Sequence, residues 1–229
     1  MPEWDELFKK DEFRWKEPHG KVVDFFTRLG KFGDHPCILD LGCGAGRHLV
    51  YLGRKGCRVV GTDISRRGLS YSASNLAEIN GSSRLVQADM TRLPFRDNSF
   101  DALITIHVIF HNPLAGVRQS ISDIFRVLRP GGLALFTFQS TLSYRYGRGV
   151  ELEPNTFLPD TGADTGVPHH YMDLEAVAHE LTAFTIWQVV LEETEDSGYR
   201  SSHWFVTTEK PVYSGRNPDQ AQGFKSVIG

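Results

Sequence analysis

Apolar residues along this chain gather in short runs, separated by longer stretches in which the spacing of apolar positions is different. Five runs of four to seven residues are rich in aliphatic and aromatic side chains: 37–41, 58–62, 85–88, 100–106 and 133–138. Runs of this length are typical of β-strands. Between them, apolar residues recur every third or fourth position, which predicts helices over 21–32, 46–55, 66–79 and 114–128.

The order of these segments predicts the fold class. Strands that alternate with helices and are apolar on both faces form a parallel sheet with helices packed on each side. After a predicted helix at 173–183, two strand-like runs at 184–190 and 204–208 flank the Asp-Ser-Gly turn at 196–198, which indicates an antiparallel hairpin at a sheet edge. We therefore expect an α/β protein with a doubly wound, mostly parallel sheet.

The stretch 140–171 interrupts this alternation. It contains glycines, prolines, tyrosines and acidic residues without a clear period, and a loop of that length in a compact domain is usually functional or disordered. We expect it to form the substrate pocket and to cover the site as a lid. The predicted organisation is a single domain over 1–210, with an N-terminal helical cap at 1–35 and a loosely held tail at 211–229.

Composition narrows the classes of partner. The chain has 229 residues, 40% hydrophobic and 23% charged, with a formal net charge of −3, so it has no basic footprint for a nucleic acid. Its three cysteines form no C-x-x-C pair, which argues against a disulfide framework or a zinc site. No apolar run approaches the roughly 18 residues that span a bilayer, and the acidic start is unlike a signal peptide. We expect a cytoplasmic protein with a small-molecule substrate and no membrane partner; the oligomeric state stays open.

A glycine-rich turn follows the first predicted strand, in the segment Ile38-Leu39-Asp40-Leu41-Gly42-Cys43-Gly44-Ala45-Gly46. Glycine allows positive φ and a close approach of the backbone to a ligand, and the start of the next helix offers free N–H groups. A dinucleotide fingerprint needs a third glycine where this chain has Arg47, so the match to that class of site is partial. Cys43 within the turn is most simply a small filler.

Three successive strands each end in an aspartate: Asp40, Asp63 and Asp89. Asp40 can accept a hydrogen bond from the amino group of a methionine-like tail, which a pyrophosphate lacks. Asp63 can take both hydroxyls of a ribose, and Asp89 can accept from an adenine amino group. Asp40 and Asp63 can alternatively cap the helices that follow them.

Four motifs in order resemble the class I S-adenosylmethionine-dependent methyltransferases over residues 36–139: ILDLGCGAG, GTDIS, QADMTRLPFRDNSFDALITIHVIFH and RVLRPGG. The segments NTFLPDTGADTGVPHHY and SHWFVTTEK resemble small-molecule enzymes near the tellurite-resistance and quinone-biosynthesis types. The resemblance implies a Rossmann-like methyltransferase fold, with a seven-stranded sheet and an antiparallel last strand. It also implies S-adenosyl-L-methionine as cofactor and S-adenosyl-L-homocysteine as product. The cofactor contacts that we carry over are Asp40, Gly42, Cys43, Gly44, Gly46, Asp63, Ile64, Asp89, Met90, Thr105, Ile106 and His107.

Three histidines are candidate catalytic residues: His111, His169 and His170. The family places the segment of His111 beside the transferred methyl, and the other two lie on the 140–171 loop. An imidazole there can hold the acceptor or remove its proton near neutral pH, although local packing is the simpler role. His107 and His111 also stand at i and i+4, as two metal ligands on a helix can, but the sequence offers no third ligand and we expect no metal.

The sequence thus predicts methyl transfer to an oxygen, nitrogen or sulfur atom of a small molecule. One alternative is an NAD(P)-dependent oxidoreductase, and another is a cofactor-binding protein without turnover. A nucleic-acid methyltransferase is the third. Enzymes that methylate base amino groups often carry Asp/Asn-Pro-Pro-aromatic after the fourth strand, where this chain has Thr-Ile-His-Val at 105–108. The identity of the acceptor stays open at this level.

Overall fold

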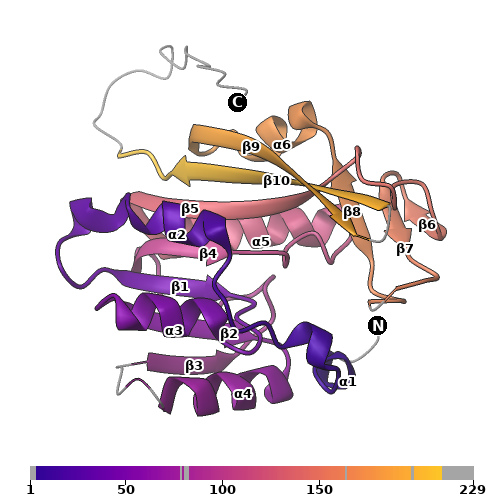
Figure 1. Cartoon of the computed structure of the whole chain (residues 1–229). Coiled ribbons are helices and arrows are strands. Elements are labelled where there is room, and N and C mark those ends of the chain that lie inside the picture. The colour runs from indigo at the N-terminus through magenta and orange to yellow at the C-terminus, as the bar shows by residue number, and fades with distance from the viewer. Residues whose placement is uncertain (1–3, 78, 80–82, 163, 197–198, 213–229) are drawn as a thin grey trace.

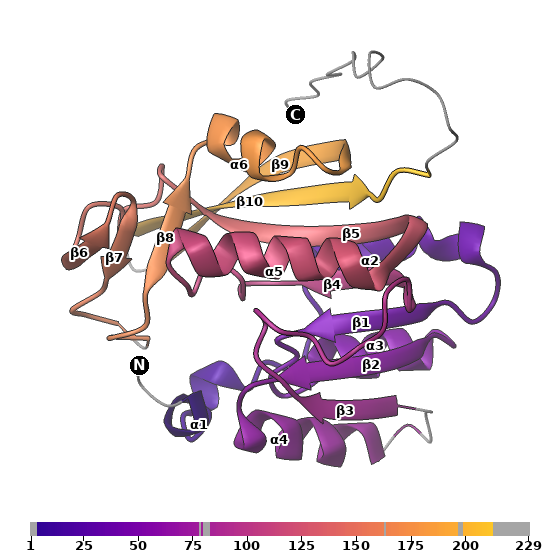
Figure 2. The ribbon, with the colours of Figure 1, turned by 180° about the vertical axis from the view of Figure 1, so that it is seen from behind.

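A parallel sheet lies at the centre of the computed structural model, with helices on both faces (Figures 1 and 2). The structure describes residues 4–212 apart from 78, 80–82, 163 and 197–198. The parallel strands follow one another in the order β3-β2-β1-β4-β5. Their bounds are β1 (Cys37–Leu41), β2 (Arg58–Asp63), β3 (Ser83–Gln87), β4 (Phe100–Thr105) and β5 (Leu128–Ser140). All six residues of β4 are buried, as expected for a strand that is covered on both faces.

The sheet continues with two long strands near the C-terminus. β10 (Tyr199–Glu209) pairs antiparallel with β5 on one side and with β9 (Thr185–Asp196) on the other. The main sheet therefore has the order β3-β2-β1-β4-β5-β10-β9, in which β10 alone runs against the others. This confirms the expected fold class, a mostly parallel seven-stranded sheet with an antiparallel last strand. The predicted hairpin forms, with β9 rather than β10 at the edge.

Two hydrophobic clusters cover the two faces of the sheet. One joins β4 to α5 (Leu114–Val127) and α6 (Leu174–Glu180), for example through Leu103, Val117 and Val177. The other joins it to α2 (Gly20–Phe26), α3 (Arg47–Arg54) and α4 (Arg66–Ala77), and includes Ala102 and Leu49. Neighbouring residues of one strand, such as Ala102 and Leu103, thus enter opposite clusters, which follows from the two-residue period of a strand.

The described part of the N-terminal segment, from Trp4 to Phe32, contains helices that are shorter than predicted. α1 (Trp4–Leu7) is followed by the 3₁₀-helix η1 (Asp11–Phe13), and the single helix expected over 21–32 is divided into α2 and the 3₁₀-helix η2 (Leu29–Phe32). The hydroxyl of Thr27 donates to the carbonyl of Asp24 (2.7 Å) where α2 ends. A side chain that satisfies a terminal carbonyl in this way competes with continuation of the helix.

The segment 140–171 contains regular structure that the sequence pattern did not reveal. β6 (Val150–Glu153), β7 (Thr156–Leu158) and β8 (His169–Met172) form a small antiparallel sheet, and β8 also pairs with the end of β5. The expectation of an aperiodic loop was wrong here because strands of three or four residues are too short to show a period. All four residues of β8 are buried, so no polar face alternates with an apolar one.

Two further expectations concern the ends and the exterior of the protein. Residues 213–229 of the predicted tail lie outside the described residues, so the domain boundaries remain a prediction. Within the described part of the chain, no helix is long and apolar enough to cross a membrane.

Candidate functional site

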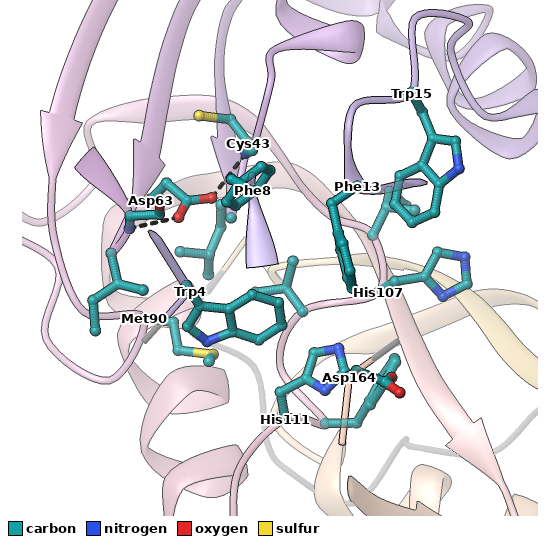
Figure 3. A pocket seen from close by; sticks show the side chains of 18 of the residues that line it. Trp4, Phe8, Phe13, Trp15, Cys43, Asp63, Met90, His107, His111 and Asp164 are labelled. Atoms are coloured by element: carbon teal, nitrogen blue, oxygen red, sulfur yellow. Dashed lines mark hydrogen bonds between the residues drawn. The ribbon is translucent and has the colours of Figure 1, made fainter. Parts of the chain in front are cut away.

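A cavity of about 1220 Å³ opens at the carboxyl ends of β1, β2 and β4. Ligands bind at this edge in doubly wound folds. The glycine-rich turn, the ends of these strands, the N-terminal segment, the 140–171 segment and the β9–β10 hairpin all contribute to its wall. Figure 3 shows side chains from several of these segments pointing into one space.

The glycine-rich turn needs its glycines for two different reasons. Gly42 and Gly44 line the cavity with φ of +73° and +52°, and a Cβ on Gly42 would lie 2.3 Å from Val108. Gly46 has φ of +85° and does not line the cavity, because it packs against Ser72 of α4, 2.6 Å from where its Cβ would stand. The turn thus exposes its backbone to the cavity at Gly42 and Gly44, and it packs against α4 at Gly46.

Asp40 has an unsatisfied carboxylate oxygen. The residue is 1% exposed, and its Oδ2 has no hydrogen-bond partner in the described structure. Nδ1 of His48 lies 3.7 Å away, which is too long for a hydrogen bond. Asp40 is not itself a lining residue, whereas His48 is. A buried carboxylate oxygen without a donor is costly, so the site fits a ligand that brings a positive donor such as an ammonium.

Asp63 lines the cavity, and its carboxylate is already oriented by the backbone. Oδ2 accepts from the N–H of Gly44 and Oδ1 from the N–H of Ser65, each at 2.8 Å. Burial raises the pKa of Asp63 to about 6, although these two hydrogen bonds act in the opposite direction. Both oxygens keep lone pairs that can accept further donors. The arrangement therefore fits a vicinal diol such as that of ribose.

The neighbouring walls supply an apolar surface and one more carboxylate. Asp89 also lines the cavity, and its Oδ1 accepts from the N–H and the hydroxyl of Thr91. Ile64 is 47% exposed, although large aliphatic side chains are usually buried. In Figure 3 the thioether of Met90 lies beside the indole of Trp4. These residues can hold a flat, partly polar ring.

His111 and His169 meet at the other end of the cavity. Their ring centroids are 4.6 Å apart in an edge-to-face contact, and the Trp4 ring lies 5.2 Å from His111. His111 is 9% exposed and its Nδ1 has no partner in the described structure. Burial, together with the charge of His169, lowers the pKa of His111 well below the usual histidine range. A neutral imidazole at this position can receive a proton.

The structure does not bring His170 into the cavity. Its Nδ1 lies 2.7 Å from the hydroxyl of Thr156 on β7, and its backbone N–H donates to the carbonyl of Phe110. His169 and His170 are consecutive residues of β8, so their side chains point to opposite faces. His169 therefore faces the ligand space, and His170 contributes to the small sheet.

His107 occupies an uncommon backbone conformation on the cavity wall. Its φ is +57°, which few residues other than glycine adopt. Its ring lies 4.5 Å from that of His203 and 5.7 Å from that of His19, and burial lowers its pKa well below the usual range. Backbone strain of this kind often accompanies ligand sites.

Most of the predicted site residues are found together. Those that line the cavity are Gly42, Cys43, Gly44, Asp63, Ile64, Asp89, Met90, Ile106, His107, His111 and His169. The remaining predicted residues, which do not line it, are Asp40, Gly46, Thr105 and His170. Thr105 is fully buried at the end of β4. Among the described residues, no group of three His, Cys, Asp or Glu side chains is arranged to hold a metal.

The N-terminal segment contributes a wall that sequence reasoning missed. Trp4, Phe8, Phe13 and Trp15 all line the cavity, and Figure 3 shows their rings turned toward it. Nothing in the local pattern connects four aromatic residues in a polar stretch to a pocket formed elsewhere in the chain. Four aromatic side chains in a polar, non-periodic segment are nevertheless a signal that it packs against something.

Arg47, which replaces the third fingerprint glycine, is a second missed residue. It lines the cavity, and its guanidinium lies 4.9 Å from the Trp15 ring centroid. Burial lowers its pKa, and the nearby charge of Asp40 acts in the opposite direction. In the described structure no carboxylate lies within salt-bridge distance of Arg47, so this cation is available to an anionic ligand group.

The strand order, the glycine-rich turn after β1 and the acidic residues at the strand ends define a Rossmann-like methyltransferase fold. Residues 39–136 match the family model described as a methyltransferase domain. Over these residues, less than half of its length, the chain is therefore similar to this methyltransferase family.

Individual relatives show a similarity over part of their length. The chain is 40% identical to a demethylmenaquinone methyltransferase of Clavibacter sepedonicus over 97 residues, 42% of this chain and 38% of that protein. For this protein and for relatives from Haemophilus influenzae and Synechocystis, the match spans less than half of the relative's own length.

Two solved structures share the fold. A methyltransferase of Methanosarcina mazei has a TM-score of 0.72 at 21% identity, with 86% of this chain and 99% of that chain covered. TehB of Haemophilus influenzae has a TM-score of 0.62 at 17% identity, with 84% of this chain and 62% of that chain covered.

Proposed function

We propose that the protein transfers a methyl group from S-adenosyl-L-methionine to an oxygen, nitrogen or sulfur atom of a small molecule. The observation that carries this proposal is a cavity whose two ends differ in chemistry. One end has the oriented Asp63 carboxylate beside the glycine-rich turn, and the other has the neutral imidazole of His111. When bound, the cofactor supplies an electrophilic methyl group on a sulfonium.

The residues of this chain hold the cofactor by complementary charge and shape. Asp40, whose unpartnered oxygen lies 3.7 Å from the lining residue His48, attracts the ammonium of the amino-acid tail by its charge, and Asp63 accepts from the ribose hydroxyls. Asp89, Met90 and Ile64 lie along the adenine side of the cavity. Donors that complete such buried acceptors are worth about 1–3 kcal/mol each.

The same residues prepare the acceptor by positioning and proton removal. The N-terminal aromatic residues and the 140–171 segment exclude water from the reacting atoms, as lids commonly do. His111 takes the proton of an acceptor that arrives in its acid form. His169 holds the acceptor, whereas His170 acts through the pairing of β7 with β8.

Two observations support a small molecule as the acceptor. The strand ends, the N-terminal segment, the 140–171 segment and the β9–β10 hairpin all border the cavity. Its volume of about 1220 Å³ suits a nucleoside-sized cofactor together with a small acceptor molecule. The Clavibacter relative is named for demethylmenaquinone, a small molecule. The proposal places the protein in the cytoplasm, where the cofactor is made and small acceptors are available.

The test is cofactor binding followed by a search for the product. Calorimetry should detect binding of S-adenosyl-L-homocysteine and no binding of NAD. Asp63→Ala should weaken the binding of S-adenosyl-L-homocysteine by about 1–3 kcal/mol. Incubation of the protein with methyl-labelled cofactor and a metabolite extract should then yield a labelled small product. NAD binding that Asp63→Ala leaves unchanged would favour an oxidoreductase. Cofactor binding without any labelled product, or with labelled nucleic acid, would favour the other two alternatives.

A further inference from the structure

Two cations and one carboxylate are held together at the acceptor end of the cavity. Asp164 accepts a hydrogen bond from the guanidinium of Arg145 (2.8 Å), and its other oxygen lies 3.0 Å from Nε2 of His169. All three side chains line the cavity. The cluster lies directly against His111, whose ring touches that of His169 and stands beside Asp164 in Figure 3.

The hydrogen-bond geometry around His169 favours the positively charged form of its ring. Nδ1 lies 3.0 Å from the carbonyl oxygen of Val167, and Nε2 faces Asp164. Both neighbours are acceptors, so this geometry favours a proton on each ring nitrogen. Burial opposes ionisation of Asp164, but the hydrogen bond and the charge of His169, with that of Arg145, hold its pKa well below the usual range. Two positive charges and one negative charge leave the cluster with a net positive charge.

No other described side chain at this end cancels that charge. Glu192, the remaining carboxylate here, already faces Nε2 of His19 at 3.2 Å and Nζ of Lys21 at 3.7 Å. Burial lowers the pKa of His203 to about 4, so this ring is neutral, as is that of His111. A sulfonium in the adjoining cofactor site adds a further positive charge. An excess of buried positive charge is unfavourable unless a ligand brings the matching anion.

We propose that the methyl acceptor is an organic acid that this end of the cavity binds as its anion: a carboxylate, an ionised phenol or enol, or a thiolate. The inference rests on the proposed function and names the substrate class of the same site. His169, Asp164 and Arg145 provide the fixed positive charge, and the neutral rings of His111 and His203 each provide an N–H donor. A neutral amine or alcohol leaves the charge of the cluster unmatched.

Such an acceptor makes the charge balance of the reaction favourable. A lone pair of the anion forms the new bond to the methyl carbon, and the electron pair of the carbon–sulfur bond returns to sulfur. The acceptor proton has already left to water before the anion binds. One positive and one negative charge disappear together, so a site that is preorganised for the pair needs little rearrangement.

The charge state of His169 is directly measurable by nitrogen NMR on protein with ¹⁵N-labelled histidine, loaded with S-adenosyl-L-homocysteine. His169→Gln identifies its signals, and His179→Gln, at an exposed histidine outside the cavity, is the matched control. We expect both ring nitrogens of His169 to be protonated near neutral pH and only one of His111. A neutral His169 would overturn the proposal. If the wild-type protein does not bind S-adenosyl-L-homocysteine at all, the proposed function is refuted instead.

A second measurement uses 4-nitrophenol, whose ionised form has its own visible absorption band. The probe is added to product-loaded protein at a pH below its solution pKa. We expect binding to increase the phenolate band, with an apparent pKa lower by about one unit, a tenfold preference for the anion. His169→Gln should abolish the shift and His179→Gln should preserve it. Preferential binding of the neutral phenol would count against the proposal. So would a failure to bind both 4-nitrophenol and the carboxylate probe 4-nitrobenzoate.

Discussion

The carboxylate of Asp5 accepts a hydrogen bond from the hydroxyl of Ser65 at 2.5 Å and another from the N–H of Arg67 at 3.0 Å. These contacts join the N-terminal segment to the start of α4, next to Asp63. They explain why aromatic residues from the beginning of the chain form part of the cavity wall. The aromatic wall therefore depends on a hydrogen bond between residues far apart in the sequence.

Removal of this link should weaken cofactor binding. Asp5→Ala leaves the hydroxyl of Ser65 and the N–H of Arg67 without their acceptor, which corresponds to about 1–2 kcal/mol, or about 5- to 30-fold in affinity for S-adenosyl-L-homocysteine by calorimetry. Glu6→Gln, at the adjacent exposed acid that pairs with Lys9, is the control and should bind normally. Equal affinities for all three proteins would show that the N-terminal wall does not contribute.

Arg47 should recognise the carboxylate of the cofactor's amino-acid tail, because it is a part-buried cation without a carboxylate partner among the described residues. Arg47→Gln should reduce affinity for S-adenosyl-L-homocysteine about tenfold or more, as expected for loss of a charged hydrogen bond. Methylthioadenosine, which lacks the tail, should bind Arg47→Gln and wild type equally. Arg54→Gln on the same helix is the control. A similar loss for both ligands would mean that Arg47 acts on the fold.

Asp63 should make the stability of the ligand-free protein depend on pH. Its folded-state pKa of about 6 lies above 3.8, the usual value for an aspartate side chain, so its stabilising contribution is full at low pH and is lost as pH rises through about 6. This difference in pKa between the folded and unfolded states corresponds to roughly 3 kcal/mol in the free energy of unfolding. The free energy of unfolding of wild type minus that of Asp63→Asn, from urea titrations, should fall by about this amount between about pH 4 and about pH 7. A constant difference would contradict the raised pKa.

The 140–171 segment should respond unevenly to ligands. β8 is buried and pairs with β5, so its amides should already be protected from hydrogen exchange without ligand. Residues 141–149 and 159–162, which join the strands, should exchange more slowly once the homocysteine product and an acceptor are bound. Unchanged exchange in both joining stretches would argue against a lid.

The three predicted histidines should separate by function when each is changed to glutamine. His111→Gln should lower the methylation rate by about 10²–10⁴-fold if the acceptor binds with its proton, and retain cofactor affinity. His170→Gln should mainly lower the melting temperature, because its ring bonds to Thr156 inside the small sheet. Rates measured across pH on a known substrate decide this. A His170→Gln variant that melts normally but loses turnover would reverse the assignment.

The sequence was informative wherever a feature is local. The strand before the glycine-rich turn, the turn itself and Asp63 lie close together along the chain, so their pattern already predicts a nucleotide-like site. His169 and His170 were both predicted as site residues because only a strand assignment shows that one must face away. That assignment was hidden, since β8 has four residues and no polar face.

The acceptor end was harder to predict because its contacts are distant in sequence or lie in irregular segments. Asp164 comes to lie between Arg145 and His169 only after the 140–171 segment folds over the sheet. Charge patterning could not reveal the cluster, because its two cations and its carboxylate lie among other polar residues. The motifs consequently locate the cofactor well and leave the acceptor to the tertiary structure.

The position of β10 has a consequence for how the protein is made. Leu133 of β5 pairs with Glu209, near the end of the described chain, and β9 has no other partner strand among the described residues. While the nascent chain is still leaving the ribosome, one edge of β5 therefore stays open until β10 has emerged. Unpaired apolar edges promote association between chains. A premature stop shortly before residue 199 should thus produce an insoluble polypeptide, although every motif for the cofactor would already have been translated.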